Sequence, residues 1–535
     1  MKLFNKIVLG VGVLGTLATG CTQGFEEANT NNNAPEVVPT YSLMYGGTRA
    51  IVDELRDEWM FSGRGVNSWV QYWAQRNYTE EDRFQYRENN NNSSWKRIYT
   101  SLNDIQRVIE IAQDPELSGS YALAYGDPDN QAAAAMILKA WTFQILADSY
   151  GAVPYHTTGA ENADFQALNI AMYPAPKYVS AEEIYPDLLN ELKAAAEMID
   201  TSKPVFTERD YIFGGNAEAW KRFANSLRVR VAVRMRAKDQ TLADKHITEA
   251  VASGVMESND HTAAYTYDAF ALKGAPKYGA FFVSNRTDFA VANSFVDLLK
   301  GLDVKPDGTT PMNNPFAGLV DPRLQKFASP VGTTTEAIKA GIVPELDDLS
   351  KYVGQPYGLD NGIASEVSPF TSLPSQGVLK VDFSEVLMEY AELCFLLSEV
   401  NNWDQMYYEK GVRASMERWG VEETKIDAYV AALPAASMET VLTQKYIALY
   451  LQPAEAWAEY RRTGYPMTII MPGDVTYVNE DGESFEFEPL VPDLTEMPAR
   501  LNFSQEEFLL NEDGYKAGVS VLGGNSLDTK VWWMP

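Results

Sequence analysis

Residues 210–236 read DYIFGGNAEAWKRFANSLRVRVAVRMR, and this stretch decides the fold class. Its large apolar side chains recur three or four positions apart, which is the spacing of one face of an α-helix. Asn216 follows the Gly214-Gly215 pair and has a side chain suited to capping the first turn. The pattern predicts an amphipathic helix that begins directly after Asn216. Its buried face would carry Trp220, Phe223, Ala224, Leu227, Val231 and Met235.

The same helical spacing returns on both sides of this stretch. Large aromatic residues alternate with small ones along each segment, as neighbouring helix pairs of the tetratricopeptide type require. The sequence therefore predicts a mainly α fold built from tetratricopeptide-like helix pairs, with an irregular loop-rich lobe and minor β-hairpins. The helical segments are 95–109, 131–150, 184–199, 386–397, 407–416, 441–450 and 454–460.

Two regions lack this periodicity and are rich in Gly and Pro. We expect one domain over residues 41–535, with a helical scaffold at about 41–257 and 384–463 and an irregular lobe at about 258–383 and 464–535. Asn479-Glu480-Asp481-Gly482 separates two short apolar runs, which predicts a β-hairpin. Loops held on a rigid scaffold are common places for binding surfaces.

The N-terminus has the parts of an export signal. Lys2 and Lys6 precede an apolar run over residues 7–17, and Ala18-Thr19-Gly20 leads into Cys21. The run is too short to span a bilayer. We expect residues 1–20 to be a signal peptide, Cys21 to receive the lipid, and residues 21–40 to form a tether. The alternative is an ordinary cleaved signal in which Cys21 is incidental.

Composition excludes several functional classes. The 535 residues carry a formal charge of −29, which argues against a nucleic-acid partner because phosphate contacts need a basic face. The same charge disfavours direct adhesion to an anionic membrane, so we expect membrane contact through the lipid only. Besides Cys21 the chain has only Cys394, which sits in an apolar string and is expected to be a buried small hydrophobe.

Several strings resemble blocks of the SusD/RagB-type nutrient-binding outer-membrane lipoproteins. Residues 210–230 are similar to the family's "GG…W.KFANSLRLR" block, and residues 454–466 are similar to its "EAW.E.RRTGYP". Glu26-Glu27 also resembles the surface-export signal of Bacteroidetes lipoproteins. The remaining similar strings are residues 151–155, 176–178 with 182–185, and 497–501 with 530–533.

The resemblance implies a location and a partner. It identifies an outer-membrane, cell-surface, lipid-anchored protein that captures a nutrient, often a glycan. It also implies a SusC-like TonB-dependent transporter as partner, with the helices forming the docking face and the irregular regions carrying the ligand site.

Catalytic motifs are missing from the sequence. The three histidines have no helical metal-ligand spacing, and no HExxH, GxSxG, P-loop or GxGxxG motif occurs. With 73 carboxylates, some pair always falls at glycosidase separation, so spacing cannot nominate a catalytic pair. The Asp/Asn-rich turns do not match the EF-hand spacing. We therefore expect no enzyme activity, no cofactor and no metal.

Arginines are concentrated on the predicted helix. We expect them to pair with carboxylates of neighbouring helices. The alternative is that they bind an anionic ligand. Arg461 and Arg462 are expected to tie the last scaffold helix to the Gly464-Tyr465-Pro466 turn. The arginines of the helix are Arg228, Arg230, Arg234 and Arg236.

Aromatic residues are the chemistry that a sugar-binding protein would use, because sugar rings stack on them while polar side chains bond the hydroxyls. Two stretches offer this mixture. In the first, Trp69, Tyr72 and Trp73 have helical spacing and are expected in the core, whereas Tyr78, Tyr86 and the run Asn89–Asn92 are expected at the surface. The candidates in the second stretch, which follows Gly274-Ala275-Pro276, are Tyr278, Phe281, Asn285 and Arg286.

Two functions remain open. One is a surface lipoprotein that binds a glycan or another nutrient and delivers it to the transporter. The other is a surface helical-repeat scaffold or adhesion protein that binds another protein and no small ligand. An exposed aromatic platform in the irregular lobe would favour the first, and apolar grooves on the helices alone would favour the second.

Overall fold

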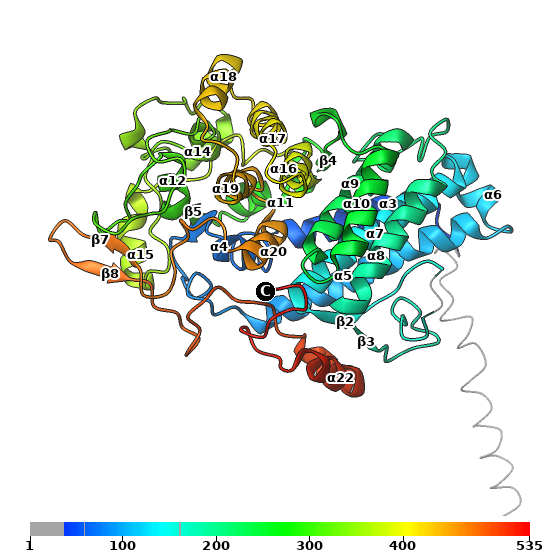
Figure 1. The fold of residues 1–535 in the computed structure, drawn as a ribbon. Helices are drawn as coiled ribbons and strands as arrows, with labels where there is room; N and C mark the ends of the chain where they lie inside the picture. The colour runs from blue at the N-terminus through cyan, green and yellow to red at the C-terminus, as the bar shows by residue number, and fades with distance from the viewer. Residues whose placement is uncertain (1–36, 58, 160–161) are drawn as a thin grey trace, which may run out of the picture. The chain divides into compact units, whose positions relative to one another are not determined.

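The structure, a computed structural model, describes residues 37–57, 59–159 and 162–535. The signal peptide, Cys21 and most of the tether lie outside the described residues. Residues 40–535 form one compact unit. It is mainly helical, with strands only in short antiparallel pairs among the described residues, as the sequence predicts (Figure 1).

The first part of the scaffold is a row of helices in which each packs against the next along the chain. In Figure 1 they lie side by side, coloured from blue through cyan to green. This arrangement confirms the predicted tetratricopeptide-like pairing. The helices are α3 (Thr40–Arg56), α5 (Glu88–Gln113), α7 (Pro128–Tyr150), α8 (Ala181–Met198), α9 (Ala217–Met235) and α10 (Gln240–Ser253).

Helix α9 begins as its sequence predicts. The Asn216 side chain accepts a hydrogen bond from the Ala219 amide at 3.1 Å, which satisfies a backbone donor that the helix itself leaves unpaired. Gly215 has a φ of +87°, and a Cβ there would lie 2.2 Å from the Phe206 carbonyl oxygen. Only glycine fits this turn, so the Gly-Gly pair sets the start of the helix.

The second helical group completes the scaffold. Helix α16 (Tyr390–Val400) packs against α17 (Gln405–Arg418), α19 (Met438–Ala448) and α9. Helix α20 (Pro453–Thr463) packs on α7, so the two groups are joined. A Cβ on Gly411 would meet the Phe395 ring at 2.7 Å, which shows how closely α16 and α17 approach. Cys394 is buried, as predicted. Helix α18 spans Glu423–Ala432.

The strands form four two-stranded antiparallel sheets among the described residues. The predicted hairpin is confirmed as β7 (Val475–Val478) with β8 (Ser484–Glu486). The other sheets join segments that are distant in sequence. They are β1 (Trp73–Gln75) with β5 (Phe289–Val291), β2 (Ala152–Pro154) with β3 (Tyr178–Ser180), and β4 (Ala263–Thr266) with β6 (Ser384–Met388).

Within residues 258–383 the helices are short. The longest are α12 (Asn293–Leu299) and α15 (Asn361–Val367). The other short elements of this region are η2 (Asn259–His261), η3 (Ala271–Lys273), α11 (Pro276–Tyr278), η4 (Gly279–Val283), α13 (Leu324–Phe327), α14 (Thr335–Ala340), η5 (Leu349–Lys351) and η6 (Ser368–Phe370).

Several local expectations differ from the structure. Trp69, Tyr72 and Trp73 are buried as predicted, but the helix α4 (Val66–Trp69) ends at Trp69 and Trp73 begins β1. Their burial therefore comes from contacts with α20 and the lobe rather than from a shared helix face. In the C-terminal region expected to be irregular, α21 (Gln505–Leu510) and α22 (Glu512–Leu522) form, and α22 packs on β2 and β3. Two further short elements are α6 (Ser118–Tyr121) and η1 (Leu123–Tyr125).

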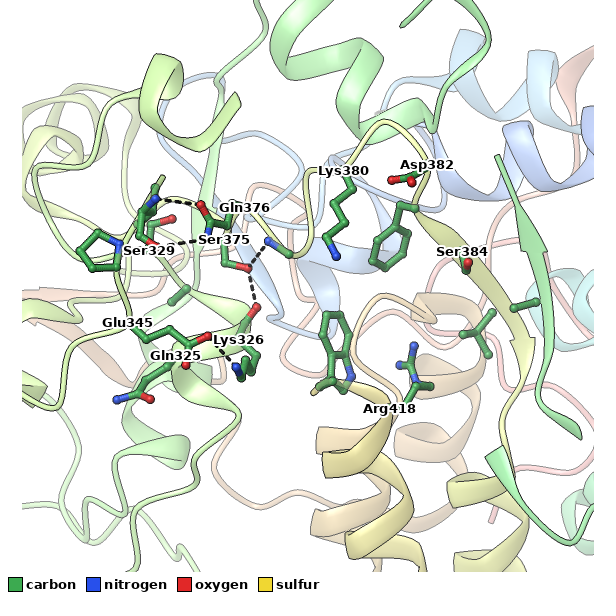
Figure 2. A pocket seen from close by; sticks show the side chains of 18 of the residues that line it. Gln325, Lys326, Ser329, Glu345, Ser375, Gln376, Lys380, Asp382, Ser384 and Arg418 are labelled. Atoms are coloured by element: carbon green, nitrogen blue, oxygen red, sulfur yellow. Dashed lines mark hydrogen bonds and ion pairs between the residues drawn. The ribbon is translucent and has the colours of Figure 1, made fainter. Parts of the chain in front are cut away.

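A cavity of about 610 Å³ lies where the scaffold meets the lobe (Figure 2). Its walls combine the β4–β6 pair, the end of α17 and loops of the lobe.

No helix of the described residues is long and apolar enough to span a bilayer. Within the same residues, no group of three or more His, Cys, Asp or Glu side chains could hold a metal ion.

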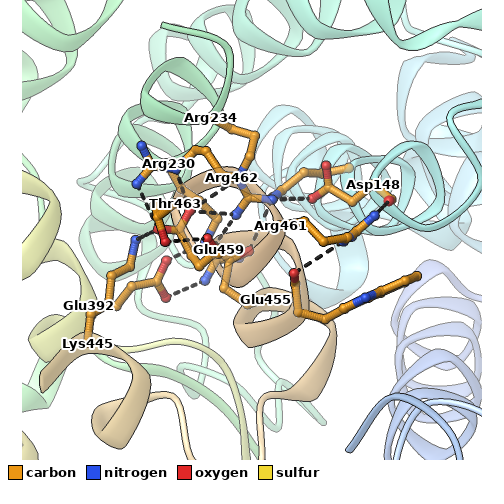
Figure 3. Close-up of polar contacts among 12 residues, drawn as sticks. Asp148, Arg230, Arg234, Glu392, Lys445, Glu455, Glu459, Arg461, Arg462 and Thr463 are labelled. Atoms are coloured by element: carbon orange, nitrogen blue, oxygen red, sulfur yellow. Dashed lines mark hydrogen bonds and ion pairs between the residues drawn. The ribbon is translucent and has the colours of Figure 1, made fainter. Parts of the chain in front are cut away.

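The arginines of α9 form a buried ion network with the other scaffold helices (Figure 3). Arg234 is fully buried and contacts Asp148 at 2.8 Å, Glu459 at 3.1 Å and Glu455. Arg230 donates two hydrogen bonds of 2.6 Å to Glu392. The prediction that these arginines pair with carboxylates of neighbouring helices is confirmed. Arg228 and Arg236, the first and last of the four predicted arginines, also pair with carboxylates. Arg228 pairs with Glu249, and Arg236, directly after α9, pairs with Asp244.

The contacts of Arg461 and Arg462 differ from the expectation. Arg461 donates to the carbonyl oxygens of Asp148 and Ala499, both at 2.7 Å. Arg462 pairs with Glu399 at 2.7 Å. The two side chains therefore join α20 to α7, to α16 and to the chain near residue 499.

Glu459 shows how strongly this network is coupled. Burial alone would raise its pKa, but Arg462, Lys445 and Arg234 hold the pKa of Glu459 well below 4.5. A carboxyl whose pKa is lowered by folding contributes stability above its unfolded pKa and loses it as the pH falls through the folded value. Glu459 therefore favours the folded state at neutral pH, whereas burial raises the pKa values of Asp148 and Glu392 in the same network.

Candidate functional site

The pairing of β1 with β5 brings the two predicted aromatic stretches together. Gln75 lies opposite Phe289 in antiparallel register, and the Arg76 amide donates to the Asp288 carbonyl at 2.7 Å. The residues that follow β1 therefore run beside those that precede β5. This register places the segment carrying Tyr78 against the segment carrying Arg286. We call the surface formed by Trp59, Arg64, Tyr78, Asn285, Arg286, Asp288 and Asn361 the Tyr78 site.

Arg64 is the buried centre of the Tyr78 site. Its guanidinium carbon lies 5.6 Å from the ring centroids of both Trp59 and Tyr78. A nitrogen of the same group pairs with Asp288 at 2.8 Å. A guanidinium within about 6 Å of aromatic faces is attracted to them. Arg64 therefore contacts both rings, while Asp288 and, at 3.9 Å, Glu81 balance its charge.

Tyr78 itself presents its ring to solvent. The residue is 51% exposed and has a φ of +58°, a left-handed conformation that is uncommon for tyrosine. Its amide donates to Asn361 Oδ1 at 2.6 Å, which ties this conformation to the start of α15. An exposed ring on a backbone held from two sides is suited to stacking against a flat ligand face.

Arg286 and Asn285 complete the rim. The Arg286 guanidinium lies 5.0 Å from the Trp59 ring centroid, and its Nε contacts Asp288 at 3.2 Å. Asn285 is exposed and has a φ of +53°. The predicted residues Tyr78, Asn285 and Arg286 are thus brought to one neighbourhood, with donors and acceptors beside an open aromatic ring.

Phe281 is not an exposed stacking ring, so that expectation is wrong. It is 1% exposed, and its ring centroid lies 6.1 Å from that of Trp73. Phe281 belongs to the core beneath β1, because the turn of η4 directs its side chain inward. Tyr278 is half-buried, with its ring centroid 5.0 Å from that of Phe282.

Tyr86 and part of the asparagine run depart from the expected exposure, whereas Asn89 is exposed as predicted. The Tyr86 hydroxyl accepts a hydrogen bond from the Asn502 amide at 3.2 Å, and its ring meets Trp69 edge-on. Burial raises the pKa of Tyr86 above its ordinary value. The run Asn89–Asn92 lies in the first turns of α5, where Asn91 is fully buried and bonds Asn502 and Tyr150. The C-terminal segment near residue 502 covers Tyr86 and Asn91.

The buried carboxyl group of Asp82 anchors the end of β1. It accepts a hydrogen bond from the Gln75 amide at 2.7 Å and another from the Ser68 hydroxyl. Burial raises the pKa of Asp82 to about 7. The strand that positions Tyr78 is therefore held by a buried polar group rather than by sheet pairing alone.

The sequence did not predict four residues of the Tyr78 site, Trp59, Arg64, Asp288 and Asn361, nor the exposure of Phe370 outside it. Trp59 and Arg64 follow α3 in a stretch with no periodic pattern, although the glycines on both sides of Arg64 mark an unusual backbone there. Phe370 is 68% exposed and follows Ser368, whose carbonyl accepts from Arg76 at 3.2 Å. No local signal links residue 370 to residue 76.

Comparisons with known proteins agree with this architecture. Residues 32–481 match a family described as "Starch-binding associating with outer membrane", and residues 434–534 match one described as "Susd and RagB outer membrane lipoprotein". No curated protein matches the sequence.

Solved structures share the fold. A SusD homolog from Parabacteroides distasonis is 22% identical, with a TM-score of 0.70 over 92% of this chain and 97% of the homolog. A chitin-binding SusD homolog from Flavobacterium johnsoniae is 23% identical, with a TM-score of 0.67 over 92% of this chain and 98% of that one. Another similar structure is described as a chitin-binding protein, with 23% identity, a TM-score of 0.69 and coverage of 93% and 100%. Because one family profile spans most of the sequence, the chain belongs to the SusD-like family of outer-membrane lipoproteins.

Proposed function

We propose that this protein captures a glycan at the cell surface and delivers it to a SusC-like TonB-dependent transporter in the outer membrane. The observation that carries the proposal is the exposed Tyr78 ring, held beside Arg286 by the β1–β5 register. The family description as starch-binding and the chitin-binding names of two similar structures support a carbohydrate ligand.

The geometry of the Tyr78 site suits a sugar. The C–H face of a sugar ring can stack on Tyr78, while Arg286 and Asn285 stand at the rim as hydrogen-bonding partners for hydroxyls. Two carboxylates offset the charges of the two arginines, since Asp288 lies within 3.2 Å of both Arg64 and Arg286 and Glu81 lies 3.9 Å from Arg64. The site therefore favours a polar, uncharged ligand, and we propose binding without catalysis, cofactor or metal.

Tyr78→Ala is expected to weaken oligosaccharide binding by about tenfold or more, because stacking on one aromatic ring contributes about 1.5 kcal/mol. Isothermal titration of the detergent-solubilised protein against maltose-, chitin- and xylan-derived oligosaccharides measures this effect. Tyr78→Phe should retain most of the affinity, since the ring remains. Phe508→Ala is the matched control, because Phe508 is also exposed but lies on α21.

Two results would contradict this proposal in different ways. If Tyr78→Ala and Arg286→Ala bind the oligosaccharide as strongly as the unaltered protein does, the Tyr78 site is not the binding site. Failure of the unaltered protein to bind any oligosaccharide in the panel would remove the glycan as ligand.

We propose that Cys21 is acylated and anchors the protein. Cys21→Ala should move the protein from the membrane fraction to the soluble fraction, because buried acyl chains supply the membrane affinity. Cys394→Ala is the matched control and should remain in the membrane fraction, since this cysteine is buried in the core. Fractionation in a host without the transporter checks both variants, and a membrane-bound Cys21→Ala protein would refute the anchor.

The proposed transporter should co-purify with the protein after gentle detergent extraction. A stable lid on a barrel would bury well above about 1,200 Å² of surface, and a complex with an interface of that size stays associated on dilution. Mass spectrometry of the purified complex would identify a large TonB-dependent protein. Recovery of the protein alone at both low and high salt would argue against the partner.

A further inference from the structure

We propose that the cavity between the scaffold and the lobe is a second carbohydrate site, which binds one or two sugar units. The inference rests on the proposed function for its ligand class. The cavity shares no residue with the Tyr78 site. In Figure 2, Lys326 and Glu345 stand on its lobe side and Arg418 and Ser384 on its scaffold side.

The cavity has the size and position of a ligand site. Its volume of about 610 Å³ falls within the roughly 300–1,000 Å³ of small-molecule pockets, which often form where two structural parts meet. One wall is the β4–β6 pair with the end of α17, and the other wall comes from lobe loops around residues 326–330, 343–345 and 375–377.

The lobe wall is pre-formed by hydrogen bonds. The Gln376 side chain pairs with the Val343 backbone in both directions, accepting at 2.8 Å and donating at 3.1 Å. The Ser375 amide donates to the Phe327 carbonyl at 3.0 Å, and the Ser375 hydroxyl donates to the Lys326 carbonyl. Since three loops are joined in this way, a ligand would bind without ordering them first.

The ionic groups of the cavity fall into two sets. Lys326 pairs with Glu345 at 2.6 Å, and Arg418 pairs with Glu389 at 2.8 Å. Lys380 and Asp382 are exposed, and neither has an ion-pair partner among the residues that the structure describes. Figure 2 shows the Lys380 side chain reaching into the cavity, with Asp382 two residues along the same rim.

These two groups point to an uncharged polar ligand. Their charges are opposite and cancel, so an anion or a cation alone would meet one repulsive partner. An ammonium donates hydrogen bonds and a carboxylate accepts them, and hydroxyl groups can do both. A ligand with several hydroxyls satisfies Lys380 and Asp382 together.

The wall formed by the β4–β6 pair and the end of α17 adds an aromatic surface. Trp419 and Phe383 are both half-buried there, with ring centroids 6.2 Å apart. Trp419 Nε1 and Asn259 Oδ1 are buried without a hydrogen-bond partner in the described structure, and both residues line the cavity. Unsatisfied buried polar atoms are rare and costly. Aromatic faces next to unpaired donors and acceptors are what a sugar ring would use.

The test uses the detergent-solubilised protein carrying Tyr78→Ala, so that the first site does not mask the second. Maltose, cellobiose and N,N′-diacetylchitobiose are the sugar probes. The dipeptide glycylglycine tests the alternative that the cavity binds a peptide. Lys380→Met and Asp382→Asn should each weaken disaccharide binding by about tenfold, which corresponds to the loss of one charge-assisted hydrogen bond. Lys351→Met and Asp303→Asn are matched controls, because both residues are exposed and outside the cavity.

Each outcome of this test supports or overturns the second carbohydrate site. Weakening in the two cavity variants but not in the controls supports the second site. Disaccharide binding that is unchanged in the cavity variants, or lost through Tyr78→Ala alone, overturns it and leaves the proposed function intact. Binding of glycylglycine in place of the sugars overturns the ligand class. Failure to bind any sugar with Tyr78 present overturns the proposed function together with this inference.

Discussion

Replacing Arg234 by leucine is expected to lower the free energy of unfolding by about 3–5 kcal/mol, because it leaves buried carboxylates without their counter-charge. Arg234 contacts Asp148 and Glu459, together with Glu455, at the centre of the scaffold. Burial alone would lower the pKa of Arg234, yet these carboxylates hold it well above its ordinary value. The folded protein therefore depends on this charge.

Arg236 provides the matched control on the chain directly after α9. It pairs with Asp244 in a partly exposed position, so Arg236→Leu should change the free energy of unfolding by no more than about 1 kcal/mol. Urea denaturation of both variants at neutral pH measures the two values. Equal and small losses would show that the buried network does not hold the helices together.

Trp220→Ala is expected to destabilise the protein by about 3–5 kcal/mol, since it removes a large buried ring and leaves a cavity. Trp220 is 1% exposed, packs edge-on against Phe213, and donates from Nε1 to Asp210 at 2.8 Å. Asp210 also accepts hydrogen bonds from the backbone before α9. Truncation therefore loosens the start of the helix as well as the core.

The melting temperature and the oligosaccharide affinity of Trp220→Ala should be measured beside those of Tyr78→Ala. We expect Trp220→Ala to lower the melting temperature and Tyr78→Ala to lower the affinity. Trp220→Phe should fall between the unaltered protein and Trp220→Ala, because the phenyl ring fills part of the space. A thermal stability unaffected by Trp220→Ala would contradict the placement of α9 in the core.

Local features of the fold follow from neighbouring residues and were predictable. The cap at Asn216, the start of α9 and the burial of Cys394 depend on side chains a few positions apart. The β7–β8 hairpin is likewise specified by its turn residues. The pairing of Arg230 and Arg234 with carboxylates was predictable in kind, since a buried guanidinium needs an acidic partner. The partners themselves, Glu392 and Glu455, were not.

The composition of the candidate site could be predicted only in part. Tyr78, Asn285 and Arg286 were recognisable as side chains outside helical periodicity, and the structure places them together. Phe281 shares that sequence context but points into the core against Trp73. A Gly/Pro-rich flank shows that a residue lies outside a long helix, and it does not show which way the side chain points.

The sequence by itself determined the helical segments, their caps and the family blocks, because these depend on contacts within one or two turns. The meeting of residues 76–78 with 286–288 depends on the β1–β5 register, which joins segments about 210 positions apart and has no local signature. The burial of Tyr86 and Asn91 likewise depends on the chain near residue 502 folding back over α5. Long-range packing therefore decided which aromatic rings reach solvent, because exposure is set by what other segments cover.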